Sequence, residues 1–417
     1  MARVLIIAYT NFIYDGRVKR HAETLAARGD SVDVVALSNG HEGVQNGVNV
    51  IGIPIARYRG ASRASYLASY LRFFSYAARL AYKLGRGNPY DVIITCTLPD
   101  VAVLSALPAR LLGSRVILDM HDTMPELYQD KFGGRRGAMG ARMLMLVERV
   151  CAGLADRVFA VHQLHRMRLQ EAGIPGRKIT VVMNSPQPDI FQAAKVRIAK
   201  PGRCVLVCHG TITRRLGIDC AIKAVNLLVG RIADLQLRVI GGGDYLQEAR
   251  LLAERLNVSD QVRFERAVPI EELPLLLNDV TIGLVPNHAN PATHLMLPVK
   301  LMEYAALGIP VIASRLRTVE HYFPAHAIRL VPPGDPEAMA GAIEELYADA
   351  KSRAGLAHNA QQIVHDLAWE NQEQHFLTAI DELVGKRRDG SRGAAVPRNN
   401  NPSRRDVEED GRALGAK

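Results

Sequence analysis

Short apolar runs alternate with amphipathic segments through both halves of this chain. The apolar runs are three to six residues long and lie at positions 4–8, 32–37, 92–95, 116–119, 158–161, 179–183, 204–209, 235–240, 262–264, 280–285, 311–313 and 328–331. The segments between them repeat apolar residues at helical spacing, as Arg17–Arg28 does with Val18, Ala22 and Leu25 on one face. Short strands separated by helices are typical of parallel, doubly wound sheets, so the sequence predicts the α/β fold class.

The two sets of strands predict two Rossmann-like domains, at residues 1–186 and 203–365. Residues 187–202 are predicted to be the linker, because prolines lie in and beside this segment and it lacks helical periodicity. Doubly wound sheets bind ligands at the carboxyl ends of their strands. We therefore expect a cleft between the domains, with a nucleotide bound by one domain and an acceptor by the other.

The C-terminal region divides into a helix and a tail. Residues 366–385 are predicted to form a C-terminal helix that returns to the first domain, with Trp369, Phe376, Ile380 and Leu383 as its anchors. Residues 386–417 contain almost no large apolar side chains, so they are predicted to be disordered.

Composition excludes several classes of function. The chain has 417 residues and a net charge of +10, which suits anionic ligands or acidic lipid surfaces. No basic stretch has the aromatic interleaving of a single-strand binder, so nucleic acid is not an expected partner. The five cysteines form no C-x-x-C pair, which argues against a zinc site or a disulfide framework. Since there is no apolar run of 18 residues, we expect no membrane span and a cytoplasmic location.

The most informative motif is PVKLMEYAALGIPVIAS at Pro298–Ser314. It closely resembles the donor-binding signature of the family-4 glycosyltransferases, which have the GT-B architecture of two Rossmann-like domains facing across a cleft. The resemblance implies that Glu303 accepts hydrogen bonds from the ribose hydroxyls of a nucleotide-sugar donor, and that Leu297, Pro298 and Lys300 also lie at the donor. A carboxylate can accept two such bonds without a metal ion.

The sequence departs from the family pattern at two places. The acidic residue that the family often carries eight positions before the ribose-binding Glu is replaced by Leu295, so backbone amides are expected to supply the sugar contacts there. The family's G-R-x-x-x-x-K-G pattern begins here at Gly210, but its Arg and Lys are replaced by Thr211 and Leu216. Arg214 or Arg215, in the same turn, is expected to bind the donor diphosphate instead, together with helix N-terminal amides.

Two further segments are expected to border the donor. The glycine turn ending at Gly243 follows an apolar run and resembles the family's turn beside the nucleotide, although a glycine cluster alone is a weak signal. Val268 occupies the position from which related enzymes hold the base through main-chain contacts.

In the first domain, polar residues follow the run at 116–119 and resemble the family's D-x-H-[DE]-x-x-P-E stretch. The resemblance implies that His121 contacts the donor sugar near the reaction centre, with Asp122 as a second catalytic candidate. Asp122 and Glu126 are expected either to orient His121 or to cap the following helix. Asp15, Gly16 and Arg17 lie between the first strand and helix, where a helix N-terminus attracts anions, and they are expected on the acceptor or phosphate side.

The segment at 57–87 carries seven basic residues and no acidic residue, interleaved with aromatic and aliphatic side chains. One interpretation is a helix that lies on an anionic membrane surface, which would place the protein peripherally at the inner face of the membrane. The other is that its apolar stripe packs on the first sheet while the arginines are solvated. Both remain open at this stage.

The sequence as a whole predicts a retaining, metal-independent glycosyltransferase that acts in exopolysaccharide or surface-glycan synthesis, retention being implied by the resemblance alone. No cofactor is expected, because the nucleotide-sugar is a substrate, and a lipid-linked glycan is the expected kind of acceptor. Two alternatives remain: a GT-B nucleotide-sugar epimerase, and a non-catalytic subunit that binds sugar nucleotides.

Overall fold

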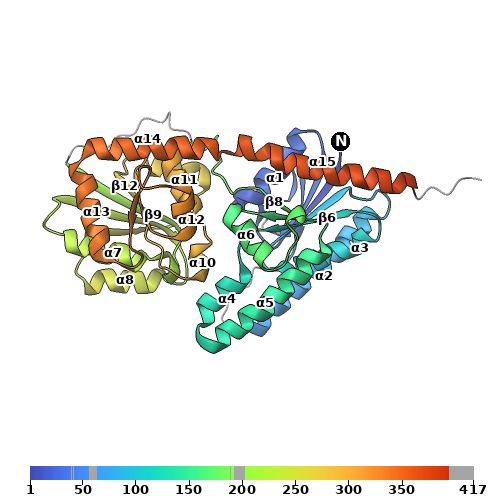
Figure 1. Cartoon of the computed structure of the whole chain (residues 1–417), viewed down its shortest axis with the longest axis horizontal. Coiled ribbons are helices and arrows are strands. Elements are labelled where there is room, and N and C mark those ends of the chain that lie inside the picture. The colour runs from blue at the N-terminus through green and yellow to red at the C-terminus, as the bar shows by residue number, and fades with distance from the viewer. Residues whose placement is uncertain (39, 41, 56–62, 188, 192–201, 394–417) are drawn as a thin grey trace, which may run out of the picture.

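The computed structural model describes residues 1–38, 40, 42–55, 63–187, 189–191 and 202–393, which form two α/β domains along the long axis of the molecule (Figure 1). Each domain has a central sheet covered by helices on both faces. The predicted fold class, with two doubly wound Rossmann-like domains, is confirmed.

The first sheet has eight strands in the order β3-β4-β2-β1-β5-β6-β7-β8, and only the β3–β4 pair is antiparallel among its pairs. Its strands are β1 (Arg3–Ala8), β2 (Ser31–Leu37), β3 (Gly43–Gln45), β4 (Val48–Ile53), β5 (Val92–Cys96), β6 (Arg115–Met120), β7 (Arg157–Ala160) and β8 (Ile179–Val181). Its helices are α1 (Gly16–Ala27), α2 (Arg63–Gly85), α3 (Leu107–Arg110), α4 (Met124–Phe132), α5 (Gly134–Leu154) and α6 (Gln163–Glu171), with a 3₁₀ turn η2 (Asp100–Ala106). Helices cover both faces, so β5 is buried at every position.

The hairpin of β3 and β4 is absent from the sequence-based prediction. Its two strands join through Asn46 and Gly47, which both have positive φ angles, of 47° and 79°. An Asn-Gly pair between short strands is the usual signal for a tight hairpin, because its twist matches that of the strands. The turn signal for this hairpin is present in the sequence, but the alternation of strands and helices does not predict it.

The second sheet has six parallel strands in the order β11-β10-β9-β12-β13-β14. Its strands are β9 (Arg203–Thr211), β10 (Asp234–Gly242), β11 (Val262–Glu265), β12 (Ile282–Val285), β13 (Val311–Ser314) and β14 (Arg329–Val331). Its helices are α7 (Ile218–Leu228), α8 (Leu246–Arg255), α9 (Leu273–Leu276), α10 (Pro291–His294), α11 (Val299–Ala306), α12 (Arg317–Tyr322), α13 (Pro336–Ala348) and α14 (Ala350–Asp366). The strand order reverses direction at β9, as it does at β1 in the first sheet, and such switch points are where open sheets bind ligands.

The last helix, α15 (Trp369–Gly393), crosses from the second domain to the first. Figure 1 shows α14 and α15 end to end along one edge of the molecule, with α15 lying across the first sheet. The four anchor residues expected from the sequence are buried among side chains of β1, α1 and β7. The His21 ring stacks on Phe376 with a centroid distance of 4.4 Å, so this helix is part of the first domain's core.

Helix α15 also continues beyond the predicted boundary at residue 385 and ends at Gly393. In this last part of the helix, the Arg387 side chain donates hydrogen bonds to Asp91 and to the Gly113 carbonyl oxygen. Composition alone does not reveal these contacts. The rest of the predicted tail, 394–417, and residues 188 and 192–201 of the predicted linker lie outside the described residues.

The apolar residues of helix α2 divide into a buried set and an exposed set. Phe73, Phe74, Ala77 and Ala81 are buried in the first domain's core, whereas other large side chains of the helix are exposed. Residues 57–62 of the basic segment lie outside the described residues. Within the described part of the chain, no helix is long and apolar enough to cross a bilayer.

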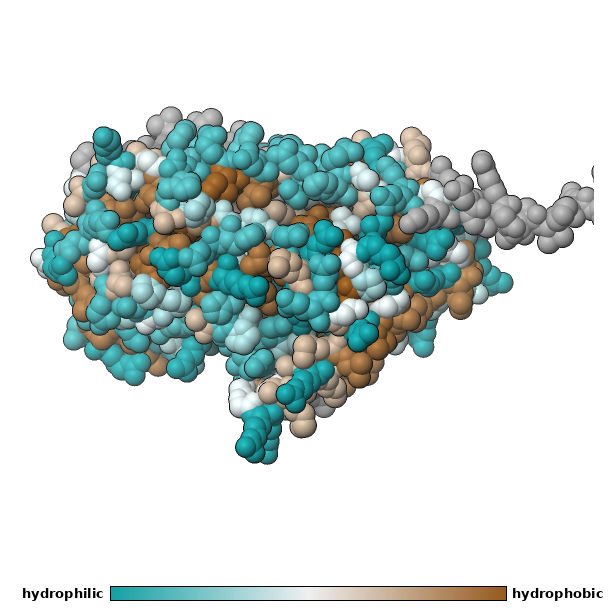
Figure 2. Space-filling model, in the orientation of Figure 1, coloured by the Kyte–Doolittle hydropathy of each residue, from teal (hydrophilic) through white to brown (hydrophobic). Residues whose placement is uncertain are grey.

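The exposed side of α2 continues through η2 and α3 to α5, and we call this surface the α2–α5 face. It exposes eight large apolar side chains, at between 48% and 87% of their area: Leu67, Leu71, Leu104, Leu111, Met139, Met143, Leu146 and Val150. Figure 2 shows it as a brown band along the lower right edge of the molecule, over the α2 and α5 labels of Figure 1.

Candidate active site

A cavity of about 690 Å³ lies between the two domains, at the carboxyl ends of both sheets. Its volume is in the usual range for a small-molecule site. The first domain contributes residues that follow β6, β7 and β8, and the second contributes the ends of β9 and β10 and the first turns of α11. The cavity therefore lies at the switch point of the second sheet, whereas the first domain lines it mainly through residues that follow β6, β7 and β8.

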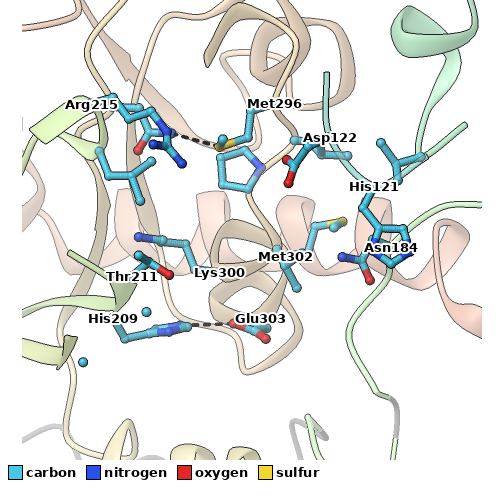
Figure 3. Close-up of a pocket in the computed structure, with 18 of the residues that line it drawn as sticks. His121, Asp122, Asn184, His209, Thr211, Arg215, Met296, Lys300, Met302 and Glu303 are labelled. Carbon is cyan, nitrogen blue, oxygen red and sulfur yellow. Dashed lines mark hydrogen bonds and ion pairs between the residues drawn. The ribbon is translucent and has the colours of Figure 1, made fainter. Parts of the chain in front are cut away.

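Glu303 lies on the cavity wall, in the middle of α11, and only 6% of its surface is exposed. Its Oε2 atom is 3.2 Å from Nε2 of His209, which is the last buried residue of β9 (Figure 3). The next residue, Tyr304, accepts a hydrogen bond from the His209 backbone N–H at 3.1 Å. Helix α11 is thereby held against β9, and a Cβ on Gly283 would lie 2.5 Å from the Tyr304 ring, so the glycine permits this packing.

Two cationic side chains of the second domain face the same cavity. Lys300 precedes Glu303 by one helical turn, and burial lowers the pKa of its amine. Arg215 lines the cavity from the turn after β9, and its buried Nε has no hydrogen-bond partner among the described residues. Arg214, the alternative from the sequence, is not among the lining residues. Of the two candidates for a diphosphate contact, Arg215 is therefore the one placed to make it.

The backbone forms the floor of the cavity at the ends of β9 and β10. Gly210, Gly241 and Gly242 line it, and a Cβ on Gly241 would lie 1.9 Å from the Gly210 carbonyl oxygen. Gly243 is not among the lining residues and packs against the Ile212 backbone, next to Gly242, which does line the cavity. The other donor-side candidates, Val268, Leu297 and Pro298, do line the cavity.

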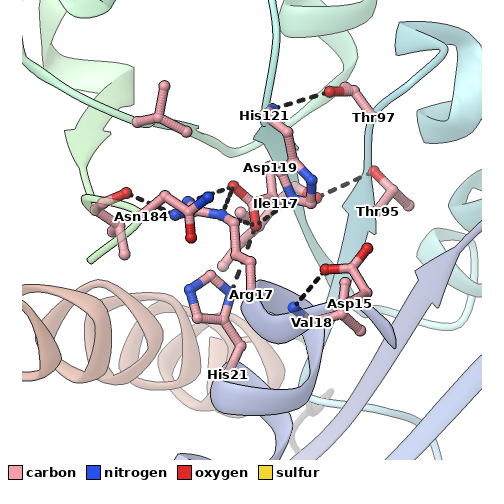
Figure 4. A network of polar contacts seen from close by, with 12 residues as sticks. Asp15, Arg17, Val18, His21, Thr95, Thr97, Ile117, Asp119, His121 and Asn184 are labelled. Atoms are coloured by element: carbon pink, nitrogen blue, oxygen red, sulfur yellow. Dashed lines mark hydrogen bonds and ion pairs between the residues drawn. The ribbon is translucent and has the colours of Figure 1, made fainter. Parts of the chain in front are cut away.

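In the first domain, the side chain that organises the site is the fully buried Asp119, at the end of β6 (Figure 4). Arg17 donates to both of its oxygens, with Nη2 2.7 Å from Oδ1 and Nε 3.1 Å from Oδ2. His121 places Nε2 3.2 Å from Oδ2, and its backbone N–H donates to Thr97 Oγ1 at 3.0 Å. His21 Nδ1 lies 3.4 Å from the same carboxylate oxygen. His121 is therefore held at its ring by Asp119 and at its backbone by Thr97.

This network sets the charge of His121. Burial alone would raise the pKa of Asp119, but the Arg17 guanidinium and His121 hold it well below its usual range. Burial alone would lower the pKa of His121, but the charge of Asp119 and its hydrogen bond outweigh burial and raise it. The His121 ring thus gains positive charge more readily than a free histidine, and it lies on the cavity wall beside Asn184 (Figure 3).

The three residues expected on the acceptor or phosphate side have other roles. Arg17 is 4% exposed and bound to Asp119, and its Nη1 donates to the Val182 carbonyl oxygen at 2.8 Å, so its expected phosphate contact is corrected to a structural one. Asp15 caps α1 by accepting a hydrogen bond from the Val18 backbone N–H at 3.1 Å. Gly16 is the first residue of that helix. Neither lines the cavity, whereas the neighbouring Tyr14 does.

Asp122 lines the cavity as expected, but it does not orient His121, because Asp119 does. Glu126 is also occupied elsewhere, since Arg168 Nε donates to its Oε1 at 2.7 Å. Sequence reasoning left out His162, Asn184 and His209, which all line the cavity. His162 and Asn184 follow β7 and β8, and His209 is the last buried residue of β9, so all three lie at the carboxyl ends of strands, and that position was the signal that could have found them.

Within the described residues, one group of side chains has the spacing of a metal site. Cys96, Asp119 and His121 offer ligand atoms within 4.8 Å of one another. However, both oxygens of Asp119 already accept hydrogen bonds from Arg17. Burial also raises the pKa of the Cys96 thiol well above its usual value, which disfavours the thiolate that a metal requires. These donors fit a metal ion poorly.

Comparison with protein families matches both domains. Residues 16–185 match the family described as "Glycosyl transferase 4-like domain", and residues 191–363 match "Glycosyl transferases group 1". The chain belongs to the family-4-like glycosyltransferases of GT-B fold. The sequence-based identification of this family, and of the protein as an enzyme, is confirmed.

Curated relatives match part of this glycosyltransferase. It is 30% identical over 175 residues to a GDP-mannose-dependent alpha-(1-6)-phosphatidylinositol monomannoside mannosyltransferase of Mycolicibacterium smegmatis, covering 41% of this chain and 46% of that protein. It is 28% identical over 188 residues to the putative colanic acid biosynthesis glycosyltransferase WcaL of Escherichia coli, covering 44% and 46%. The matches span about half the length of these relatives.

Solved structures match over nearly the whole chain. The sucrose-phosphate synthase of Thermosynechococcus elongatus has a TM-score of 0.75 at 20% identity, covering 93% of this chain and 100% of that one. HepE of Anabaena, in complex with UDP and glucose, has a TM-score of 0.70 at 16% identity, covering 91% and 100%. At these identities the likeness shows the shared fold alone.

The buried network predicts a difference between two substitutions. Asp119→Asn leaves the Arg17 guanidinium buried without its counter-charge, so the free energy of unfolding should fall by about 3–5 kcal/mol. His121→Asn removes a side chain that is 19% exposed and keeps the backbone bond to Thr97, so it should cost roughly 0.5–1.5 kcal/mol. Urea denaturation of the two variants and the parent measures both; equal losses would contradict the central role of Asp119.

Proposed function

We propose that this glycosyltransferase moves a sugar from a nucleoside-diphosphate sugar, bound mainly by the second domain, to an acceptor hydroxyl delivered from the first domain. The observation that carries the proposal is the placement of Glu303. A nearly buried carboxylate, held on α11 beside His209 at the carboxyl ends of the strands, suits the two ribose hydroxyls of a nucleotide. The family resemblance supports the same role.

The cations of the cavity support a place for the diphosphate. Lys300 lies one turn from Glu303 on the same helix, and Arg215 faces the cavity across the end of β9. Planar guanidinium donors suit phosphate oxygens, and both charges act in a partly enclosed site where they are screened little by water. The base is then assigned to the wall formed by Ala267, Val268 and Ile270, which is apolar and offers main-chain groups.

The proposed transfer needs groups that stabilise a leaving diphosphate. The bond between the sugar C1 and the diphosphate oxygen breaks as a bond from C1 to the acceptor oxygen forms. The acceptor proton passes to the diphosphate, whose negative charge is held by Arg215 and Lys300. His121, with its raised pKa, is assigned to a sugar hydroxyl at the same centre. Retention of configuration is carried over from the family resemblance.

For the acceptor we propose a lipid-linked glycan, and for the process the assembly of a surface or extracellular polysaccharide. The names of the relatives support this, since one acts on a phosphatidylinositol mannoside and another in colanic acid biosynthesis. Phosphate-linked or membrane-linked acceptors are also consistent with a chain of net charge +10.

The ribose contact is tested with Glu303→Ala and Glu303→Gln. Loss of one or two charge-assisted hydrogen bonds should weaken the binding of both nucleotide and nucleotide-sugar about tenfold or more. Thermal shift against UDP-, GDP- and ADP-sugars first identifies the base, because a binder raises the melting temperature, and titration calorimetry then gives each affinity.

The matched control is Glu345→Ala, which removes a half-exposed carboxylate from α13. It should bind like the parent. If Glu303→Ala also binds like the parent, the nucleotide does not lie where we propose. Incubation of the parent with a labelled donor separates the alternatives: conversion of the sugar to its epimer indicates an epimerase, and binding without transfer or hydrolysis indicates a non-catalytic subunit.

We further propose that the reaction needs no metal ion. The positive charge that a divalent ion would supply is available from Arg215 and Lys300, and the described residues near them form no carboxylate pair. Transfer should therefore proceed at the parent rate in excess EDTA. Abolition of activity that is restored by Mg²⁺ or Mn²⁺ would contradict this.

The α2–α5 face supports peripheral attachment to an anionic membrane surface. Exposed cations flank its apolar side chains: Arg72, Arg79 and Lys83 on α2, and Arg135, Arg136, Arg142 and Arg149 on α5. The two acidic residues of these elements, Asp100 in η2 and Glu148 in α5, are both buried. Apolar residues with uniformly positive flanks suit acidic lipid headgroups, whereas two copies of this face would repel each other.

Vesicle sedimentation tests this attachment. The parent should bind vesicles that contain phosphatidylglycerol, release them at high salt, and bind phosphatidylcholine vesicles weakly. Arg79→Glu with Arg142→Glu should abolish most of the binding. The matched control, Arg255→Glu with Arg263→Glu, makes the same charge change at exposed positions of the second domain and should bind like the parent. Equal binding to both vesicle types, or equal effects of the two double variants, would overturn the proposal.

A further inference from the structure

Two hydrogen bonds cross the cleft from consecutive residues at the start of α6. His162 Nε2 lies 2.9 Å from the carbonyl oxygen of Leu295, and the Gln163 backbone N–H donates to Tyr322 Oη at 2.9 Å. The His162 and Tyr322 rings also meet edge to face, with centroids 6.2 Å apart. Figure 1 places α6 and α4 of the first domain opposite α10 and α12 of the second. These bonds therefore form a small clasp between the domains.

The hydrogen bonds of His162 determine its tautomer. Nδ1 accepts a hydrogen bond from the His165 backbone N–H at 3.0 Å and so caps α6, which leaves the ring proton on Nε2. Nε2–H then donates to the Leu295 carbonyl oxygen. Burial lowers the pKa of His162 to about 4, so the neutral ring that this pattern requires is the form present near pH 7.

Leu295 belongs to the loop at residues 287–297, which otherwise is braced within the second domain. Asn290 and Thr293 form a capping box, and Thr293 Oγ1 also donates to the His288 carbonyl oxygen at 2.6 Å. Thr318 Oγ1 donates to the His294 carbonyl oxygen at 2.8 Å. The next carbonyl, that of Leu295, is held by the first domain instead. The N–H of the same peptide, that of Met296, donates to the Thr293 carbonyl oxygen at 3.2 Å, so the Leu295–Met296 peptide is held by both domains.

Residues 295–297 form part of the cavity wall. Leu295, Met296 and Leu297 all line it, directly before the helix that carries Lys300 and Glu303. The side chain at 295 is apolar, so it cannot bind a sugar through charge. Any polar contact from this stretch must come from its backbone, whose position depends on what holds the Leu295 peptide.

We propose that His162 is a positioning residue: by holding the Leu295 carbonyl across the closed cleft, it sets the backbone of residues 295–297 for the sugar of the donor. This rests on the proposed function and adds to it a link between domain closure and the donor sugar. The nucleotide contacts of the second domain do not need the clasp, since Glu303, His209 and Arg215 are positioned within that domain. The sugar contacts do need it.

His162→Asn removes the clasp bond to Leu295 but keeps the cap of α6. Asparagine is a good N-cap, so α6 keeps its first hydrogen bond, but the shorter side chain does not reach the Leu295 carbonyl. Tyr322→Phe removes the other bond of the clasp while keeping the ring. Tyr347→Phe is the matched control, because its hydroxyl donates to the Gly202 carbonyl oxygen within the second domain, away from the cleft.

Two sets of measurements are made on each protein. Calorimetry with UDP and GDP alone, and with UDP-glucose and GDP-mannose, separates nucleotide from sugar contacts. His162→Asn and Tyr322→Phe should bind the free nucleotide like the parent and the nucleotide-sugar about threefold to tenfold more weakly, as expected for the loss of one neutral hydrogen bond. Hydrogen exchange of the amides at 288–297 should be faster in both variants, with or without ligand.

The possible outcomes distinguish this proposal from the proposed function. If the parent binds neither nucleotide nor nucleotide-sugar among the UDP, GDP and ADP series, the proposed function fails. If the parent binds a nucleotide-sugar and His162→Asn matches it in both affinity and exchange, the clasp has no positioning role. A loss of nucleotide and nucleotide-sugar binding by the same factor also overturns the proposal, because a general weakening of the fold would act on both. Tyr347→Phe should match the parent in every measurement.

Discussion

A single buried carboxylate, that of Asp119, joins the parts of the first domain that meet at the cleft. It lies at the end of β6, receives Arg17 from α1, and contacts both His21 and His121. Arg17 also donates to the Val182 carbonyl oxygen, which follows β8. The Arg17–Asp119 pair therefore connects β6, α1 and the segment that leads to the linker. A buried ion pair of this kind stabilises the fold only while both members are present. Removal of either member leaves the other as an unpaired charge in a site of low dielectric. His121 acquires its orientation and its tendency to be protonated from the same carboxylate.

The second domain uses a different arrangement for its half of the site. Glu303 and Lys300 project from one helix, and Tyr304, between them and the core, anchors that helix to β9 through the His209 backbone. Each half of the cavity is thus built within its own domain. Among the described residues, polar contacts between the halves include the His162 and Gln163 bonds to Leu295 and Tyr322 and an ion pair between Lys19 and Glu271. Helix α15 provides the larger connection, since Trp369 and Phe376 pack in the first domain after the chain has left the second.

Much of the fold could be predicted from the sequence because parallel strands are buried on both faces. Continuous apolar runs therefore mark them, and the donor signature at Pro298–Ser314 located the helix of Glu303. The hairpin at Asn46–Gly47 was missed although its turn signal was present. The extent of α15 depends on contacts of Arg387 with Asp91 and Gly113, which are nearly 300 residues away in the chain and leave no local signal.

For the site, the sequence by itself located part of the cleft wall, because polar residues that follow buried strands in a doubly wound sheet must lie at its carboxyl edge. It could not determine which polar residue remains free to meet a ligand. Arg17 and Asp119 both occupy that edge, yet they neutralise each other in the core, whereas Arg215 and His121 face the cavity. That division depends on distances between residues more than 100 positions apart, and on the cost of burying an unpaired charge. Only the tertiary structure decides it, since pairing is a property of packed elements and residue type does not reveal it.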